Sequence, residues 1–185
     1  MLRTLPGVLL GATLLCALLG PMAAHAQQRP APSGGSQPGS GPQRLGTYGN
    51  WIAATHQESG GKVCYAFTRA SRSEGGGQRQ NVMMTVTHRP AGRDQVAVRV
   101  GHPFARNAEV TVRIGERDLP FYTAGDTAFA RGGVATIAAL RDGREATARG
   151  PGPGNRGGTS DTFSLNGFTG AYDAISRECP AAARR

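Results

Sequence analysis

The chain has 185 residues, of which 28 are Gly and 12 are Pro, and 38% of the positions are hydrophobic while 18% are charged. This composition excludes a collagen, a coiled coil, a multi-pass membrane protein and a wholly disordered polymer, and the length allows one domain with appendages. The formal net charge of +9 favours acidic partners, but it defines neither a fold nor a reaction.

The first 26 residues have the pattern of a secretory signal. One basic residue, Arg3, precedes an apolar run over residues 8–19, and small residues follow up to Ala26. The run is short for a membrane span, so we expect cleavage after Ala26, no transmembrane segment in the mature protein, and a periplasmic or secreted location. The alternative is a retained N-terminal anchor. Cleavage would remove Cys16 and leave a net charge of +8.

Residues 27–45 are predicted to form a disordered linker. From Gln27 to Arg44 the sequence is rich in Pro, Gly and Ser and holds no apolar residue larger than Pro, so it cannot bury enough surface to offset the entropy of ordering. The folded domain is then expected over residues 46–182, which is long enough for a single two-layer core.

Four segments of the domain alternate apolar and polar residues with the period of a strand. Short breaks with Gly or Pro separate them, which favours an antiparallel meander, because parallel crossovers need a dozen or more residues. The apolar positions are Val63, Tyr65 and Phe67, then Val82, Met84 and Val86, then Val96, Val98 and Val100, then Val110, Val112 and Ile114. Shorter strands are expected at residues 121–122, 127–131, 145–149 and 159–165.

Two later segments, residues 134–140 and 168–175, have the apolar spacing of helices. Gly143 is expected to end the first helix in a left-handed conformation, and Asn166 is expected to cap the start of the second. The predicted fold class is therefore mostly β: an antiparallel, β-sandwich-like single domain with two short helices.

The mature chain keeps two cysteines, Cys64 and Cys179, and an even pair in an exported protein is expected to oxidise. A disulfide between Cys64 and Cys179 would close a loop of 115 residues, and closing a loop of this length stabilises the fold by about 4 to 5 kcal/mol in the chain-entropy model. Cys64 shares a strand face with the small residues Ala66 and Thr68, and we expect the second helix to cover that face. The alternatives are two buried free thiols, or cysteines at a sandwich edge with the helix packed elsewhere.

Candidate chemistry is sparse. His88 and His102 lie near the ends of predicted strands, and with Asp126 they define the alternative function, a hydrolase or metal-dependent enzyme. No fixed ligand spacing and no nucleophile elbow accompany them, and the Gly-rich loop over residues 150–158 lacks the lysine of a phosphate-binding loop. We therefore expect no catalytic residue, no metal and no cofactor.

Basic residues are spread along the domain. Arg99, Arg113, Arg149 and Arg156 are the candidate anion-binding surface, and Arg99 and Arg113 would form a stripe if their strands were neighbours. The alternative to an anion-binding surface is that these arginines are simply part of a solvated face of the protein. Export and an aromatic content of 6% argue against a nucleic-acid partner.

Seven short segments, taken in order, resemble the invasion associated locus B family of exported bacterial proteins. They are Tyr48–Trp51, Cys64–Ala66, Val86–Pro90, Gly101–Phe104, Tyr122–Asp126, Asp161–Phe168 and Cys179. The resemblance implies a periplasmic or surface-exposed β-rich domain, named for a role in host-cell invasion, particularly of red blood cells, and without an established reaction. Many relatives place a further cysteine shortly after the Trp, where this chain has Ala53, Ala54 and Thr55, and an aromatic residue where it has His102.

The sequence therefore predicts an exported envelope protein that acts as a non-catalytic interaction or adhesion-type module, in host-cell invasion or in envelope homeostasis. Its partner would be an envelope or host-surface component. The positive charge of the mature chain favours an anionic one.

Overall fold

The computed structural model describes residues 41–181, so the predicted signal peptide and most of the predicted linker lie outside the described residues. The first strand begins at Gln43, which makes the last three residues of the predicted 27–45 linker part of the sheet. Leu45 accounts for the difference, because its side chain packs against the hydrophobic core.

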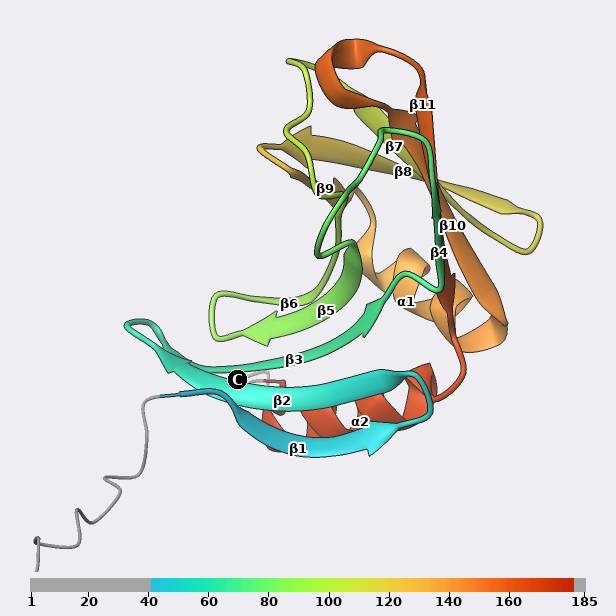
Figure 1. Ribbon diagram of the computed structural model, residues 1–185. Coiled ribbons are helices and arrows are strands. Elements are labelled where there is room, and N and C mark those ends of the chain that lie inside the picture. The colour runs from blue at the N-terminus through green and yellow to red at the C-terminus, as the bar shows by residue number, and fades with distance from the viewer. Residues whose placement is uncertain (1–40, 182–185) are drawn as a thin grey trace, which may run out of the picture. The chain divides into compact units, whose positions relative to one another are not determined.

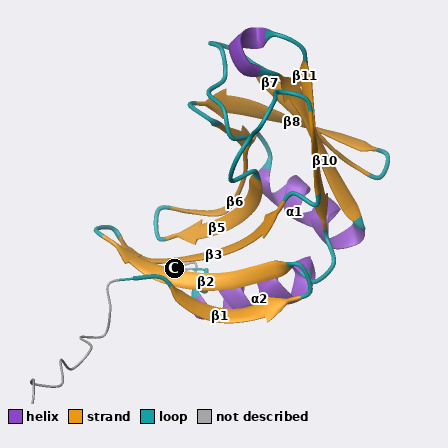
Figure 2. Ribbon diagram, viewed as in Figure 1, coloured by secondary structure: helices purple, strands orange, loops and turns teal. Residues whose placement is uncertain are grey.

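Within the described residues the strands form one antiparallel sheet of 11 strands, with the order β1-β2-β3-β5-β6-β9-β8-β7-β10-β11-β4 (Figures 1 and 2). Their bounds are β1 Gln43–Tyr48, β2 Trp51–Glu58, β3 Gly61–Arg69, β4 Arg72–Glu74, β5 Met83–Arg89, β6 Gly92–Arg99, β7 Glu109–Ile114, β8 Arg117–Ala124, β9 Thr127–Ala130, β10 Glu145–Pro151 and β11 Gly158–Ser164.

The sheet folds back on itself, because β3 and β4 are consecutive pieces of chain with only Ala70 and Ser71 between them. β3 pairs with β5, whereas β4 pairs with β11 at the far end of the strand order. At the junction the Ala70 amide donates to the Val82 carbonyl at 3.0 Å, and the Ser71 amide donates to the Thr162 carbonyl at 2.8 Å. Two parts of one sheet thus enclose a common core, and the predicted sandwich-like, mostly β fold is confirmed.

Every predicted strand is present, and the predicted alternation decides which side chains are buried. In β7, for example, Val110, Val112 and Ile114 are buried while Glu109, Thr111 and Arg113 are exposed. The prediction of a continuing meander is wrong after β6, which pairs with β9 rather than β7. The reason is that the chain beyond β6 is bound to the β8–β9 turn, where the Phe104 amide donates to the Gly125 carbonyl at 2.8 Å.

Both predicted helices form, as α1 (Gly133–Asp142) and α2 (Phe168–Glu178), and a short 3-10 helix, η1 (Pro153–Asn155), lies in the β10–β11 connection. Both cap predictions are wrong. Gly143 is extended, with φ −85°. Gly167, and not Asn166, caps α2, with φ +89°, and a Cβ on Gly167 would lie 2.0 Å from the Tyr48 carbonyl oxygen. Close packing of the helix start on the β1–β2 turn therefore demands a glycine there.

The face of β1, β2 and β3 that carries Cys64 is covered by α2 (Figure 1). Trp51 and Phe168 form the centre of this contact, with ring centroids 4.9 Å apart in an edge-to-face arrangement, and the Trp51 indole N–H donates to the Ser164 carbonyl at 2.9 Å. Both residues are fully buried. Within residues 41–181, neither helix has the length and apolar character that a membrane crossing requires.

Candidate functional site

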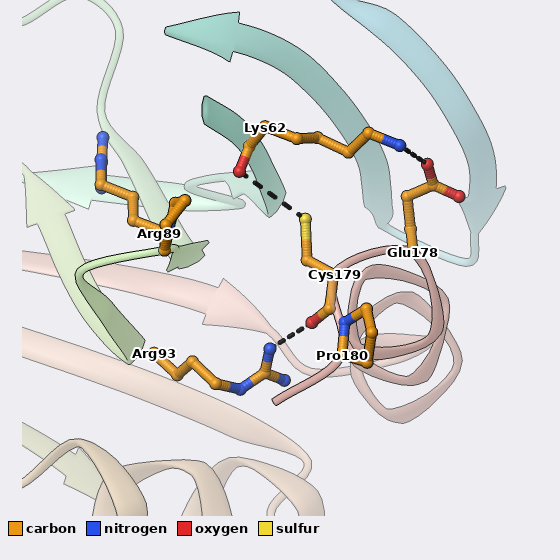
Figure 3. Close-up of a pocket in the computed structure, with 7 residues that line it drawn as sticks. Lys62, Arg89, Arg93, Glu178, Cys179 and Pro180 are labelled. Carbon is orange, nitrogen blue, oxygen red and sulfur yellow. Dashed lines mark hydrogen bonds and ion pairs between the residues drawn. The ribbon is translucent and has the colours of Figure 1, made fainter. Parts of the chain in front are cut away.

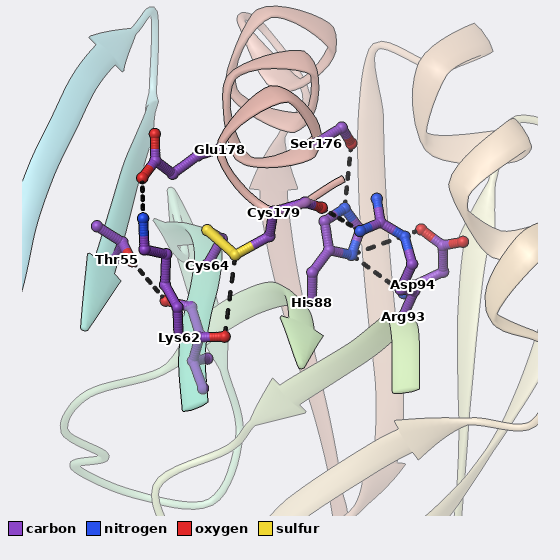
Figure 4. Close-up of a disulfide and its surroundings, with 10 residues drawn as sticks. Thr55, Lys62, Cys64, His88, Arg93, Asp94, Ser176, Glu178 and Cys179 are labelled. Carbon is purple, nitrogen blue, oxygen red and sulfur yellow. Dashed lines mark hydrogen bonds and ion pairs between the residues drawn. A yellow bond between two sulfur atoms is a disulfide. The ribbon is translucent and has the colours of Figure 1, made fainter. Parts of the chain in front are cut away.

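The predicted disulfide joins Cys64 in the middle of β3 to Cys179 at the end of α2 (Figure 4). The two Cα atoms are 6.0 Å apart, and the bridge closes a sequence separation of 115 residues. Cys64 is fully buried beneath the helix, on the same strand face as Ala66 and Thr68. Small side chains on that face let the helix approach closely, so the prediction that the disulfide fastens α2 to this strand is confirmed.

A cavity of about 420 Å³ opens beside Cys179, and its lining includes Lys62, Arg89 and Arg93 (Figure 3). Three cations around a cavity suggest an anion site. Each of them, however, already has a partner within the described residues. Lys62 pairs with Glu178 at 2.6 Å, Arg89 pairs with Glu58 at 3.2 Å, and Arg93 donates to the Cys179 carbonyl.

The position of this cavity also disfavours an anion. It lies at the C-terminal end of α2, where the helix dipole is negative, and a cation there stabilises the helix end. Arg93 does so by capping a carbonyl. The Arg89 guanidinium in turn holds the pKa of the exposed Glu58 carboxyl below its usual value, chiefly through a side-chain hydrogen bond. Lys62 and Arg93 therefore bind the end of α2, and Arg89 binds Glu58, so all three cations already have partners in the fold.

His88 lies beneath α2, directly opposite Cys64 in the β3–β5 register, and it is fully buried. Its Nδ1 accepts the backbone N–H of Asp94 at 3.2 Å, and its Nε2 lies 3.1 Å from the hydroxyl oxygen of Ser176 on α2 (Figure 4). An acceptor at Nδ1 places the proton of the neutral ring on Nε2, which donates to Ser176. Burial and then the charge of Arg93 lower the pKa of His88, while Asp94 opposes the shift.

The Ser176, His88 and Asp94 side chains superficially look like a hydrolase triad. In such a triad the histidine nitrogen that faces the serine must be free to take the hydroxyl proton. Here that nitrogen carries the proton, and the lone pair faces the Asp94 amide instead. The Asp94 carboxylate accepts the Tyr172 hydroxyl at 2.6 Å, and this bond, after burial, raises the pKa of Tyr172. The cluster therefore locks α2 onto the β5–β6 hairpin and does not activate Ser176.

The alternative enzyme site is not assembled around His88, His102 and Asp126. His102 is buried beyond the other end of β6, and its Nδ1 lies 3.1 Å from the Pro103 carbonyl. Asp126 lies in the β8–β9 turn and pairs with Arg99 at 2.7 Å. Burial by itself would raise the pKa of Asp126, but bonds from Thr127 and Arg99 outweigh it and lower the pKa. Residues 41–181 contain no group of three His, Cys, Asp or Glu side chains arranged to hold a metal.

Comparisons with known proteins show which family the chain belongs to. The model of the invasion associated locus B protein family matches residues 51–176. The chain belongs to the invasion associated locus B family. The match runs from Trp51, beneath α2, to Ser176, the hydrogen-bond partner of His88, so it includes both sides of the helix–sheet contact.

One solved structure of an invasion associated protein is similar to this chain over most of the domain. The crystal structure of invasion associated protein B from Bartonella henselae has a TM-score of 0.54 and 20% sequence identity, and the similarity covers 72% of this chain and 95% of that one. At this identity the likeness concerns the fold alone. A comparison with curated proteins finds no match.

The four arginines of the predicted anion-binding surface are dispersed in this member of the invasion associated locus B family. β9 and β8 lie between β6 and β7, so the condition for an Arg99–Arg113 stripe, neighbouring strands, is not met. Arg113 and Arg149 instead lie on adjacent strands and on one face, because Arg113 opposes Thr147 and Arg149 opposes Thr111. Arg156 directly follows η1.

The most buried ion pair of residues 41–181 was not predicted; it joins Arg79 in the β4–β5 loop to Asp161 on β11. Two bonds of 2.7 Å join the guanidinium to the carboxylate, and their side chains are 2% and 1% exposed. The remaining guanidinium N–H groups donate to the carbonyls of Glu74, Gly75 and Val100. The charged Asp161 at an inward position of β11 indicated a buried partner, but that partner, Arg79, lies 82 residues away in the sequence and could not be identified from local pattern.

Proposed function

We propose that this protein is an exported, non-catalytic interaction module of the bacterial envelope or cell surface, and that its partner is an anionic component of the envelope or of a host cell. The names of the family and of the Bartonella henselae protein support a part in invasion. The disulfide supports export, because such bonds persist in oxidising compartments. A signal peptide over residues 1–26 and a linker from residue 27 are parts of the proposal.

The observation that carries the anionic partner is the excess of arginine. The whole chain has 21 Lys and Arg against 12 Asp and Glu, and its single lysine is Lys62. Guanidinium groups are planar and weakly hydrated, which suits carboxylate, sulfate and phosphate groups on a partner. Several exposed arginines form no ion pair within residues 41–181: Arg106, Arg144, Arg149, Arg156 and Arg177.

The test is binding of the mature protein to envelope fractions and to host-cell membranes over a series of salt concentrations, with mass spectrometry of the captured partner. Binding should weaken steeply as salt rises, because exposed charge pairs are screened. The Arg149→Gln, Arg156→Gln double variant should bind more weakly. Arg72→Gln is the matched control, since Arg72 is exposed but already pairs with Glu74. Salt-independent binding would remove the anionic partner from the proposal.

A further inference from the structure

The sheet face opposite α2, called the outer face here, carries a row of side chains defined by strand register. Phe67, Thr85, Ala97, Phe129 and Tyr122 are successive cross-strand neighbours on β3, β5, β6, β9 and β8. The row therefore has two small residues in its middle and aromatic residues on both sides. Neighbouring strands lie about 4.8 Å apart, so the two aromatic groups are separated by roughly 14 Å.

A hollow of about 210 Å³ lies over the middle of this row, with Thr85 and Ala97 in its floor and Phe129 at its side. A second hollow of about 310 Å³ is lined by Tyr122 and shares Phe129 and Gln95 with the first. Phe129 is thus a ridge between two connected depressions. We call these two depressions together the trough.

Tyr122 and Phe129 line the trough, and Phe67 is the cross-strand neighbour of Thr85 in its floor. Tyr65 and Phe67 of β3 have ring centroids 6.1 Å apart and Tyr122 and Phe129 have centroids 5.6 Å apart, both with interplanar angles of 26°. Tyr122 is 45% exposed, which is unusual for a large aromatic side chain. The guanidinium of Arg131 lies 5.7 Å from the centre of the Tyr122 ring. An exposed aromatic side chain such as Tyr122 next to a depression is typical of a binding surface rather than of a solvated one.

The polar groups of the trough are side chains, because the strands of its floor are paired on both edges. Thr85, Thr87 and Gln95 offer hydroxyl and amide groups. At one end, register places Met83 between Arg69 and Arg99. At Thr85 and Ala97 both strand edges are already paired, so this part of the floor offers no free edge to an added peptide strand, and a ligand there is recognised through its faces and its hydroxyl or charged groups.

We propose that the trough binds an extended, carboxylate-bearing glycan. A sugar ring has an apolar C–H face, which packs on the electron-rich face of an aromatic ring, and a rim of hydroxyls, which suits Thr and Gln. A sugar carboxylate fits Arg69, which pairs with no carboxylate in residues 41–181, whereas Arg99, across Met83, already pairs with Asp126. This inference rests on the proposed function and names the class of its anionic partner.

The charges favour a glycan over a single-stranded nucleic acid. A nucleic acid needs a continuous cationic groove along its phosphates. Here Arg99 is compensated by Asp126 and Arg89 by Glu58, so the trough carries only a modest positive charge. A chain with one carboxylate in every second unit matches that charge better than one with a phosphate on every unit.

The experiment measures binding of the full mature protein to three labelled probes: a hyaluronan octasaccharide, a neutral N-acetylglucosamine hexamer and a thymidine 15-mer. We expect the hyaluronan probe to bind most tightly. Phe129→Ala, which removes the ridge, and Thr85→Trp, which fills the floor while keeping both walls, should each weaken its binding by about tenfold or more, as loss of an aromatic stacking contact does. Val134→Ala, a change at an apolar residue that is 76% exposed on α1, is the control and should have no effect.

Each variant is compared with the wild type in its thermal midpoint, so that a folding defect is recognised. No binding of hyaluronan, tighter binding of either other probe, or equal binding by folded Thr85→Trp overturns the glycan site. The two proposals fail separately. If Thr85→Trp still binds envelope or host membranes in a salt-dependent way, the interaction module stands and the trough is not its site.

Discussion

The buried Arg79–Asp161 pair gives the sharpest stability prediction. In the Arg79→Met variant the Asp161 carboxylate, 1% exposed, loses its only charged partner, and the carbonyls of Glu74, Gly75 and Val100 lose donors. Removing one member of a buried pair costs about 3 to 5 kcal/mol, because a charge is left uncompensated in a medium of low polarity. That is a large part of the roughly 5 to 15 kcal/mol that stabilises a typical domain.

The measurement is urea unfolding of the oxidised protein, followed by tryptophan fluorescence, since Trp51 is the only tryptophan. The control is Arg72→Met, which breaks an exposed pair and should change the free energy of unfolding by less than about 1 kcal/mol. Adding Asp161→Leu to Arg79→Met should recover much of the loss, because no unpaired charge then remains. A loss below about 1 kcal/mol for Arg79→Met, or no recovery in the double variant, would refute this reasoning.

Three further predictions concern the contact of α2 with the sheet. The pKa of His88 is lowered in the folded protein, so the unfolded chain binds more protons in acid, and the free energy of unfolding should fall as the pH drops below about 6.5. The His88→Gln variant should lose this pH dependence, and the control His56→Gln should keep it. Replacing Cys64 and Cys179 by Ser should cost about 2 to 5 kcal/mol in urea unfolding, and an unchanged midpoint would contradict a structural bridge. Gly167→Ala should lower the free energy of unfolding by about 1 to 3 kcal/mol, because φ is +89° at this position. An unchanged thermal midpoint would refute the close approach of Gly167 to the Tyr48 carbonyl.

Local patterns accounted for the elements of the fold. Alternation placed the strands around Cys64, Met84, Val98 and Val112 correctly, because one face of each strand is buried and the side-chain period is two. The disulfide was predicted from the pair of cysteines left in an exported chain, and the parity argument found the strand face that α2 covers. β2 was missed because Ala53 and Ala54 are both buried and the alternation is lost there, and β1 and β4 were missed because neither has a buried face.

Features that depend on long-range topology were not visible in the sequence. The pairing of β6 with β9 depends on hydrogen bonds between the chain after β6 and a turn more than twenty residues later. The caps were misjudged because contact with Tyr48, and not intrinsic preference, selects Gly167. His88 was considered only together with His102 and Asp126, and the positions of Ser176 and the Asp94 amide are what reveal its tautomer.

The mass of the mature protein, recovered from the compartment where it resides without reduction and after thiol alkylation, tests the central claim most directly. The account predicts a chain that begins at Gln27, carries no alkyl group, and takes up two alkyl groups only after reduction, at Cys64 and Cys179. A protein that retains residues 1–26 would contradict removal of a signal peptide, and cysteines that alkylate without reduction would contradict the stapled helix.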